Sequence, residues 1–163
     1  MLYIIGRNLF DVLPSKINES LGMSISKRFT RSLSKEIEGE VTDKFLELLL
    51  NGLKLMFILN KEFRQNIENF QGGYLFTTSD NSVETLAVFK NASMKVYDSR
   101  KNGWNVKVTF KDAKSLKQFI FSRNQDILDS LLTNTVEVDG NLNYLYKFGF
   151  MARDLMRRLG IQN

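Results

Sequence analysis

Side chains able to carry acid–base or metal chemistry are scarce in this sequence. Histidine and cysteine are both absent, which removes the commonest general base, the thiolate nucleophile and the usual zinc ligands. Asp126 and Asp129 stand three residues apart on a predicted short helix and form a candidate carboxylate pair. Isolated acids at this spacing are usually surface residues. We therefore predict a protein that is not an enzyme, with no catalytic residue, no metal site and no cofactor.

Motifs for phosphate or nucleic acid are also missing. Gly72-Gly73 is followed by neither the Lys-Ser nor the longer glycine pattern of a phosphate loop, so it indicates the start of a strand or a bulge. The chain has no zinc site, no glycine-rich RNA motif and no aromatic stripe interleaved with basic residues. Nucleic acid is therefore not a predicted partner.

Basic side chains give another candidate site, because the net charge of the chain is +5. They form two clusters of Lys and Arg: Lys27, Arg28 and Arg31 in the first, and Arg153, Arg157 and Arg158 in the second. Near an anionic membrane each such residue contributes about 1 kcal/mol of attraction. We predict peripheral contact of these six residues with anionic headgroups. The plainer interpretation, a solvated face with Asp154 as a local partner, stays open.

The composition is that of one ordinary domain with a large supply of apolar side chains. The chain has 163 residues, 43% of them apolar, and 13 are Phe. Its most apolar stretch, residues 45–59, is too short to span a bilayer and is interrupted by Glu47, Asn51 and Lys54. The apolar run at residues 2–5 is far shorter than the core of a signal peptide. These features predict a soluble, cytoplasmic protein.

The N-terminal part shows helical spacing that is broken by Pro14 and Gly22. Apolar residues recur there at steps of three or four, at Leu9, Phe10, Leu13, Ile17, Leu21, Ile25, Phe29 and Leu33. We predict short helices or a loosely packed arm, and assign residues 1–41 to an N-terminal helical extension of a domain at 42–163. A firmer helix is predicted from Thr42, with a wide apolar face and one narrow polar stripe at Lys44, Glu47, Asn51 and Lys54.

After Gly73 the apolar period changes to two, which predicts strands at residues 74–78, 83–89, 92–97 and 104–111. Their three short connections predict an antiparallel meander. Asp112 is a candidate N-cap of the next helix, and Asn134 a candidate C-cap of a short helix that follows it. A fifth strand at 136–138 and a final amphipathic helix after Gly140 complete the order.

This order resembles the sterol carrier protein family, the non-specific lipid-transfer domain, over about residues 72–150. The likeness is carried by residues 104–120, where Thr109, Phe110, Asp112, Ala113 and Leu116 fit a strand that turns into a helix, and by residues 136–148, where Val136, Val138, Gly140, Leu142 and Leu145 fit the last strand and helix. The resemblance implies an α+β fold, with a five-stranded, mostly antiparallel sheet and helices on one face. A helical leader ahead of such a domain also resembles the lipid-binding accessory factors of bacterial ubiquinone biosynthesis.

Members of the sterol carrier protein family bind lipids in a tunnel beneath the last helix, so the resemblance implies such a cavity here. Its predicted lining comes from the final helix, an opposing helical wall and the sheet: Leu142, Leu145, Tyr146 and Gly149; Phe119, Ile120, Leu128, Leu131 and Leu132; and Trp104, Val106 and Phe110. Phe148 and Met151 are expected on a flank of the helix. Plain core packing of the same apolar stripe is the alternative.

The function predicted from these features is non-catalytic binding or transfer of a hydrophobic small molecule: a fatty acid, phospholipid, sterol or isoprenoid quinone intermediate. The loop at residues 122–125 or the final helix would open to admit the apolar tail. Two alternatives stay open. One is an interaction or homodimerisation module that buries helix 43–59 and the last helix against a partner. The other is an accessory factor that presents lipid intermediates to biosynthetic enzymes.

Overall fold

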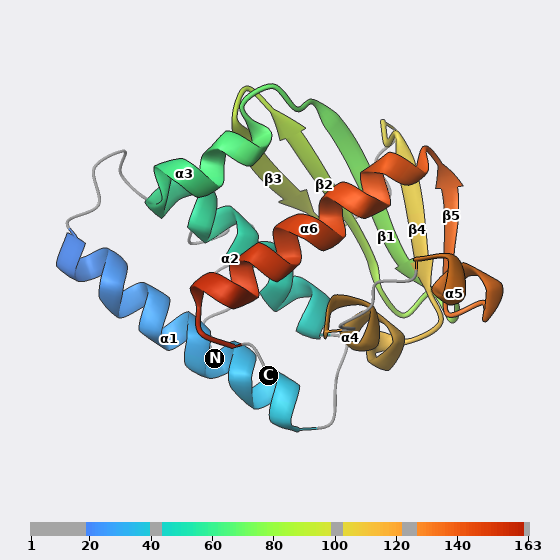
Figure 1. The fold of residues 1–163 in the computed structure, drawn as a ribbon, viewed down its shortest axis with the longest axis horizontal. Coiled ribbons are helices and arrows are strands. Elements are labelled where there is room, and N and C mark those ends of the chain that lie inside the picture. Colours follow the sequence, from blue (N-terminus) through green and yellow to red (C-terminus); the bar gives the residue numbers. More distant parts are fainter. Residues whose placement is uncertain (1–18, 40–43, 99–102, 122–126, 162–163) are drawn as a thin grey trace.

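Figure 1 shows the computed structural model of the chain, a sheet covered by helices. It describes residues 19–39, 44–98, 103–121 and 127–161, and for residues 19–22, 127 and 128 it describes the backbone alone. The helices are α1 (Glu19–Glu38), α2 (Lys44–Leu59), α3 (Lys61–Arg64), the 3₁₀ turn η2 (Gln65–Ile67), α4 (Ala113–Phe121), α5 (Ile127–Leu132) and α6 (Leu142–Arg158). The strands are β1 (Gly72–Thr78), β2 (Glu84–Lys90), β3 (Ser93–Tyr97), β4 (Val106–Phe110) and β5 (Val136–Gly140).

The five strands form one mixed sheet in the order β3-β2-β1-β4-β5. Three of the four pairings are antiparallel, and β1 pairs with β4 in parallel. The predicted α+β class and the mostly antiparallel sheet are therefore confirmed. The predicted meander is wrong at its third connection, because β4 does not pair with β3 but crosses to the far side of β1.

This crossover is short because β3 and β4 reach the same level of the sheet. Tyr97 and Lys107 belong to one row across the strands, so the connection spans three strand spacings, or about 14 Å. Residues 98–105 cover this at about 3.3 Å each. A long helical crossover is therefore not needed, and the length of the connection alone did not distinguish it from a hairpin loop.

Gly73 makes the end of this crossover fit against β1. A Cβ at Gly73 would lie 2.7 Å from the carbonyl oxygen of Gly103, so only glycine allows the close approach. Asn105 holds the contact from both sides, because its Oδ1 accepts a hydrogen bond from the Gly73 N–H and its own N–H donates to the Gly73 carbonyl, each at 2.8 Å. The glycine pair therefore marks a strand start, as the sequence predicts.

The helices gather on one face of the sheet (Figure 1). The strand register places Tyr74, Phe76, Ala87, Phe89 and Val108 toward them. The opposite face pairs Lys107 with Asp139 and Thr109 with Glu137 across β4 and β5, as expected for a sheet with one polar face.

α1 is one helix of 20 residues, and the short helices or loose arm predicted over this part of the chain are wrong for it. Phe29 and Leu33 of α1 belong to the same buried cluster as the sheet residues. Gly52 of α2 permits the contact, since a Cβ there would meet the Phe29 ring at 2.2 Å. The boundary at residue 41 lies outside the described residues and stays a prediction, as do the apolar positions before residue 19.

α2 is covered on nearly every side. The polar stripe predicted along it is exposed at Lys44 and Glu47, but Lys54 is 6% exposed. α1 packs along α2, which explains why the stripe does not reach water along its whole length. No helix in the described part of the chain is long and apolar enough to cross a membrane.

Polar caps fix the ends of the later helices where the sequence predicts them. Asp112 accepts hydrogen bonds from the hydroxyl and the backbone N–H of Ser115, both at 2.7 Å. The hydroxyl bond, and then the N–H bond, lower the pKa of Asp112. Asn134 has a φ of 52°, and the N–H of Thr135 bonds to the carbonyl of Ser130 at 3.0 Å, which is a Schellman end. Asn141 caps α6 by accepting from the N–H of Asn143.

Candidate functional site

Six aromatic rings occupy the space between α6 and the sheet. We call this set the aromatic layer: Phe70, Tyr74, Phe76, Phe89, Tyr144 and Phe148. The Tyr74 and Phe76 rings stack at 5.5 Å between centroids, and Phe148 of α6 lies 4.6 Å from Phe76. At the other end, Phe70 lies 5.4 Å from both Phe89 and Tyr144. Offset and edge-to-face pairs at these separations are favourable contacts beyond their apolar area.

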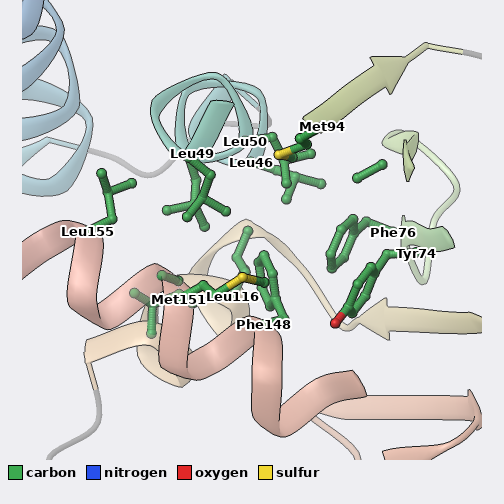
Figure 2. Packing of buried hydrophobic residues seen from close by; sticks show 14 of the residues in the cluster. Leu46, Leu49, Leu50, Tyr74, Phe76, Met94, Leu116, Phe148, Met151 and Leu155 are labelled. Atoms are coloured by element: carbon green, nitrogen blue, oxygen red, sulfur yellow. The ribbon is translucent and has the colours of Figure 1, made fainter. Parts of the chain in front are cut away.

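The aromatic layer fills the region where the resemblance implies a cavity. Tyr74 and Phe76 are fully buried, and Phe148 is 1% exposed. Figure 2 shows the three side chains converging from the sheet and from α6. Among the described residues, rings therefore occupy this part of the interior.

Tyr74 supplies one polar group inside the aromatic layer. Its hydroxyl donates a hydrogen bond of 2.9 Å to the backbone carbonyl oxygen of Tyr144, in the first turn of α6. Burial, and then the neighbouring Tyr144, raise the pKa of Tyr74 above its usual value of 10.0. The hydrogen bond ties β1 to the start of α6.

Lys147 stands at the margin of the same layer. Its Nζ lies 4.9 Å from the centre of the Phe70 ring, a cation–π contact. Partial burial lowers the pKa of Lys147 from its usual value of 10.5. Tyr144 closes this margin over the strand, because a Cβ added at Gly72 would lie 2.6 Å from its ring. A cation and two rings therefore border the edge of the interior nearest to the start of α6.

A second, aliphatic set of side chains joins α6 to α2 farther along the helix. We call Leu46, Leu49, Leu50, Met151 and Leu155 the aliphatic layer. All five are 4% exposed or less, and Figure 2 shows Leu155 and Leu49 directed toward one another. Gly52 brings the helices close, since a Cβ there would also meet Cδ2 of Leu155 at 3.2 Å.

One small hollow lies away from α6. It has a volume of about 10 Å³ and is lined by Leu46, Thr77, Thr78, Val83, Phe110, Asp112, Ala113 and Leu116. This volume suits about one water molecule. The hollow is therefore far too small for a lipid chain.

Half of the predicted lining residues are buried in the common core. Val106, Phe110, Phe119, Ile120 and Leu145 are each 4% exposed or less, and Gly149 is buried within α6. The Phe110 and Phe119 rings lie 5.9 Å apart. The structure thus brings the floor and one wall together, although whether they contact a ligand stays a prediction.

The expected inward orientation is wrong for four of the predicted residues, and Leu128 lies among the side chains that are not described. The exposed fractions are 36% for Trp104, 81% for Leu132, 40% for Leu142 and 50% for Tyr146. Leu131 is partly buried against the core. On α6 the inward stripe is turned by about one residue, or 100°, so that Phe148 and Met151, expected on a flank, face the core.

The sequence reasoning missed most of the aromatic layer. Tyr74, Phe76 and Phe89 alternate along β1 and β2, and this period of two was the available signal. On α6 the set Leu145, Phe148, Ala152 and Leu155 also has helical spacing. Periodicity therefore allowed two faces of the helix, and the choice between them depends on what lies beneath.

The predicted headgroup residues divide into exposed and engaged side chains. Arg153 is partly buried, and its Nε donates a hydrogen bond of 3.2 Å to the carbonyl oxygen of Gly149. Lys27, Arg28 and Arg31 of α1 are exposed. Arg157 and Arg158 both pair with Asp154, at 2.5 and 3.0 Å. Arg158 also lies 3.6 Å from Glu62. The predicted local partner Asp154 is thus present, and burial, which would raise its pKa, is outweighed by the two arginine hydrogen bonds that lower it.

The candidate carboxylate pair is described only in part. Asp129 is exposed in the first turn of α5, and Asp126 lies outside the described residues. Among the residues that the structure describes, no three His, Cys, Asp or Glu side chains gather in a way that could hold a metal ion.

Known proteins match this chain through structure and not through sequence. No protein-family model matches the sequence, and no curated protein matches it significantly. Among solved structures, a UbiJ-SCP2 ubiquinone synthesis protein is 18% identical with a TM-score of 0.50, over 68% of this chain and 98% of that protein. A double mutant of the sec-alkyl sulfatase PisA1 is 19% identical with a TM-score of 0.51, over 67% of this chain but 16% of the sulfatase.

A sterol carrier protein domain 2 from Helicoverpa armigera is also similar, at 14% identity and a TM-score of 0.48, over 72% of this chain and 91% of that domain. At such identities the likeness concerns the fold. The chain therefore has a sterol-carrier-protein-like fold, in which helix α1 packs against α2.

Proposed function

We propose that this protein reversibly binds a hydrophobic small molecule between the first half of α6 and the sheet, without catalysing a reaction. The aromatic layer carries the proposal. It is a largely apolar interior in which the buried Tyr74 hydroxyl is hydrogen-bonded to α6 and one cation, Lys147, stands at the margin. Ligand sites of this kind are lined mostly by apolar and aromatic groups, with a few placed polar groups.

Entry of a ligand requires the aromatic layer to open, because its rings fill the interior. The first half of α6 rests on the sheet through the rings of Tyr144 and Phe148 and through the Tyr74 hydrogen bond. The second half is held by the aliphatic layer. We infer that the start of α6 lifts while its end stays in place, and that Phe148 and Tyr144 swing aside. The loop at residues 122–125, the other predicted gate, lies outside the described residues.

The free energy gained by burying an alkyl chain exceeds the cost of displacing one ring. Each buried methylene contributes about 0.8 kcal/mol, so a ten-carbon tail contributes about 8 kcal/mol before ordering costs. Displacing one phenyl ring from the core costs about 3–5 kcal/mol when nothing replaces it. A ligand that fills the vacated volume removes part of that cost.

The polar groups indicate which end of the ligand stays outside. A tail would lie along Phe76 and Phe148, and a polar head would remain near Tyr144 and Lys147 at the margin. An anionic head, such as a fatty-acid carboxylate or a phosphate, fits the Lys147 cation. Within the broad class of fatty acids, phospholipids, sterols and isoprenoid quinone intermediates, we therefore favour single-tailed anionic lipids.

The structure bears on one part of the alternative function, the interaction or homodimerisation module. That module requires helix 43–59 to bury its apolar face against a partner, but Leu49, Leu53 and Phe57 of α2 are already buried within the chain. Presentation of a lipid to an enzyme is compatible with the same interior and differs in what happens after release.

The test is ligand uptake by the purified full chain. Native mass spectrometry of protein taken from cells should show a co-purifying lipid, and titration with fluorophore-labelled palmitate should saturate at one site. Phe148→Ala should bind the probe more tightly than the wild type, whereas Leu132→Ala, at an exposed position, should not. If neither the wild type nor Phe148→Ala takes up the probe, and no lipid co-purifies, the proposal is rejected.

A further inference from the structure

Three apolar side chains on the outer face of α6 remain exposed. Leu142, Tyr146 and Phe150 are 40%, 50% and 56% exposed. They stand four residues apart, so they form one ridge along the helix. The sheet and α2 are covered by the opposite face of α6, through Leu145, Phe148 and Leu155. The described residues therefore leave about half of each of these three side chains exposed.

Two arginines continue the same ridge toward the end of α6. Arg153 and Arg157 follow Phe150 at steps of three and four residues, so they point the same way. We call these five residues the α6 ridge; at 1.5 Å per residue it is about 22 Å long. α6 carries four basic side chains and one acid, Asp154, which pairs with Arg157 and Arg158. Among the described residues, no carboxylate pairs with Arg153.

We propose that the α6 ridge docks on an anionic membrane surface. The apolar residues Leu142, Tyr146 and Phe150 would enter the boundary between headgroups and acyl chains. Arg153 and Arg157 would meet lipid phosphates. Helices that lie in the interface combine these two properties, an apolar face with aromatic residues and basic side chains beside it. The exposed cations of α1, Lys27, Arg28 and Arg31, extend the positive charge of the molecule.

The arginines of the ridge favour an anionic membrane over a second copy of the chain as its partner. If two ridges paired in parallel, Arg153 would face Arg153. If they paired in antiparallel fashion, the arginines would be placed against Leu142 and Tyr146 of the partner. Both arrangements leave Arg153 near the apolar contact without a carboxylate. An anionic bilayer supplies the counter-charge beside a hydrocarbon layer. The inference does not depend on the proposed function, because the ridge faces away from the aromatic layer.

The experiment is flotation of the full chain with lipid vesicles. Vesicles of phosphatidylcholine alone should bind little protein, and vesicles containing phosphatidylglycerol should bind most of it at low salt. Tyr146→Ser with Phe150→Ser, and separately Arg153→Gln with Arg157→Gln, should each lower partitioning onto the anionic vesicles by about tenfold or more. High salt should weaken binding of the wild type further.

Matched controls are Leu132→Ser, which removes an apolar residue that is 81% exposed, and Lys90→Gln with Lys95→Gln, which remove exposed cations of β2 and β3. These variants should bind like the wild type. Circular dichroism should show that all variants keep the same helix content. Binding of fluorophore-labelled palmitate without vesicles should be unchanged in the ridge variants, which separates this inference from the proposed function.

Any one of three outcomes would overturn the inference. The first is equal binding of the wild type to anionic and neutral vesicles, and the second is binding of the ridge variants at the level of the controls. The third is a dimer, detected by light scattering, that is lost only in the ridge variants. The last result would assign the ridge to a second copy of the chain.

Discussion

The two halves of α6 pack against different kinds of side chain, aromatic in the first half and aliphatic in the second. Its first half contacts the aromatic layer and is tied to β1 by one side-chain hydrogen bond from Tyr74. Its second half is packed by the aliphatic layer onto α2, where Gly52 allows close approach. The first half is therefore held by ring contacts with the sheet and one hydrogen bond, whereas the second half is close-packed against a facing helix. One helix therefore combines an end packed onto another helix with an end packed onto the rings of the sheet, and the latter is the end that we propose to open.

The largest expected effects come from truncating one side chain in each layer. Phe148→Ala should lower the free energy of unfolding by about 3–5 kcal/mol, and Leu155→Ala by about 2–5 kcal/mol. Uptake of labelled palmitate should increase in Phe148→Ala alone, because the cavity that it leaves lies in the opening half. Denaturant unfolding and probe titration measure the two properties. Equal gains in uptake by both variants would remove the distinction between the layers.

Two glycine substitutions give a smaller and closely matched pair. A Cβ at Gly52 would meet the buried Phe29 ring, and a Cβ at Gly72 would meet the ring of Tyr144, which is half-buried. Gly52→Ala should destabilise the fold by about 1–3 kcal/mol, since the buried Phe29 ring cannot move away without displacing its neighbours. Gly72→Ala should cost less, because Tyr144 can move outward, and it should speed probe entry. Stopped-flow fluorescence measures that rate; slower entry in Gly72→Ala would count against Tyr144 as part of the gate.

Removal of the Tyr74 hydroxyl should have an effect of about 1 kcal/mol. Tyr74→Phe deletes the hydrogen bond to the Tyr144 carbonyl and leaves the ring in place, at a cost of about 0.5–1.5 kcal/mol. Amide hydrogen exchange should increase in the first turns of α6 and not in the last turns. Uniform protection along α6 in this variant would show that the bond does not hold that end. Tyr97→Phe, on β3, is the control.

The smallest expected effect concerns the acid stability of the end of α6 that packs onto α2. Asp154 keeps a lowered pKa in the fold because its hydrogen bonds with Arg157 and Arg158 outweigh its burial. A carboxyl whose folded pKa is below the unfolded value of 3.8 adds stability above that pH and loses it as the pH falls through the folded pKa. Asp154→Asn should therefore lose at most about 1 kcal/mol near neutral pH and show a flatter stability curve in acid. Asp139→Asn, on β5, is the control, and matching curves for the two variants would contradict the assignment.

The sequence allowed most elements of the fold to be predicted, and the reasons are local. Asp112, Asn134 and Asn141 signal helix ends through their own hydrogen bonds or φ angles, so these ends needed no tertiary information. The parallel β1–β4 pair could not be predicted in this way. A connection of eight residues permits a hairpin loop or a crossover, and Gly73 alone hints at the second.

The candidate site was less accessible to prediction for a related reason. The stripe through Leu142 and Tyr146 and the stripe through Leu145 and Phe148 are both apolar with helical spacing. Which one faces inward depends on the rings of β1, which stand some 70 residues earlier in the chain, as the Tyr74–Tyr144 bond shows. Apolar residues on both faces of α6 were the signal that the helix has two uses, one toward the core and one toward a surface.

The position of β1 in the middle of the sheet has a consequence for biosynthesis. β1 and β2 are consecutive in the chain and pair as neighbours, but β4 lies beside β1 only after the crossover, and α6 follows β5. Until then the side of the Tyr74 and Phe76 rings that Phe148 of α6 contacts in the folded chain has no helix over it. These two rings therefore stay incompletely covered for the time it takes to translate nearly half the sequence. A chaperone that shields exposed aromatic segments would have its target there.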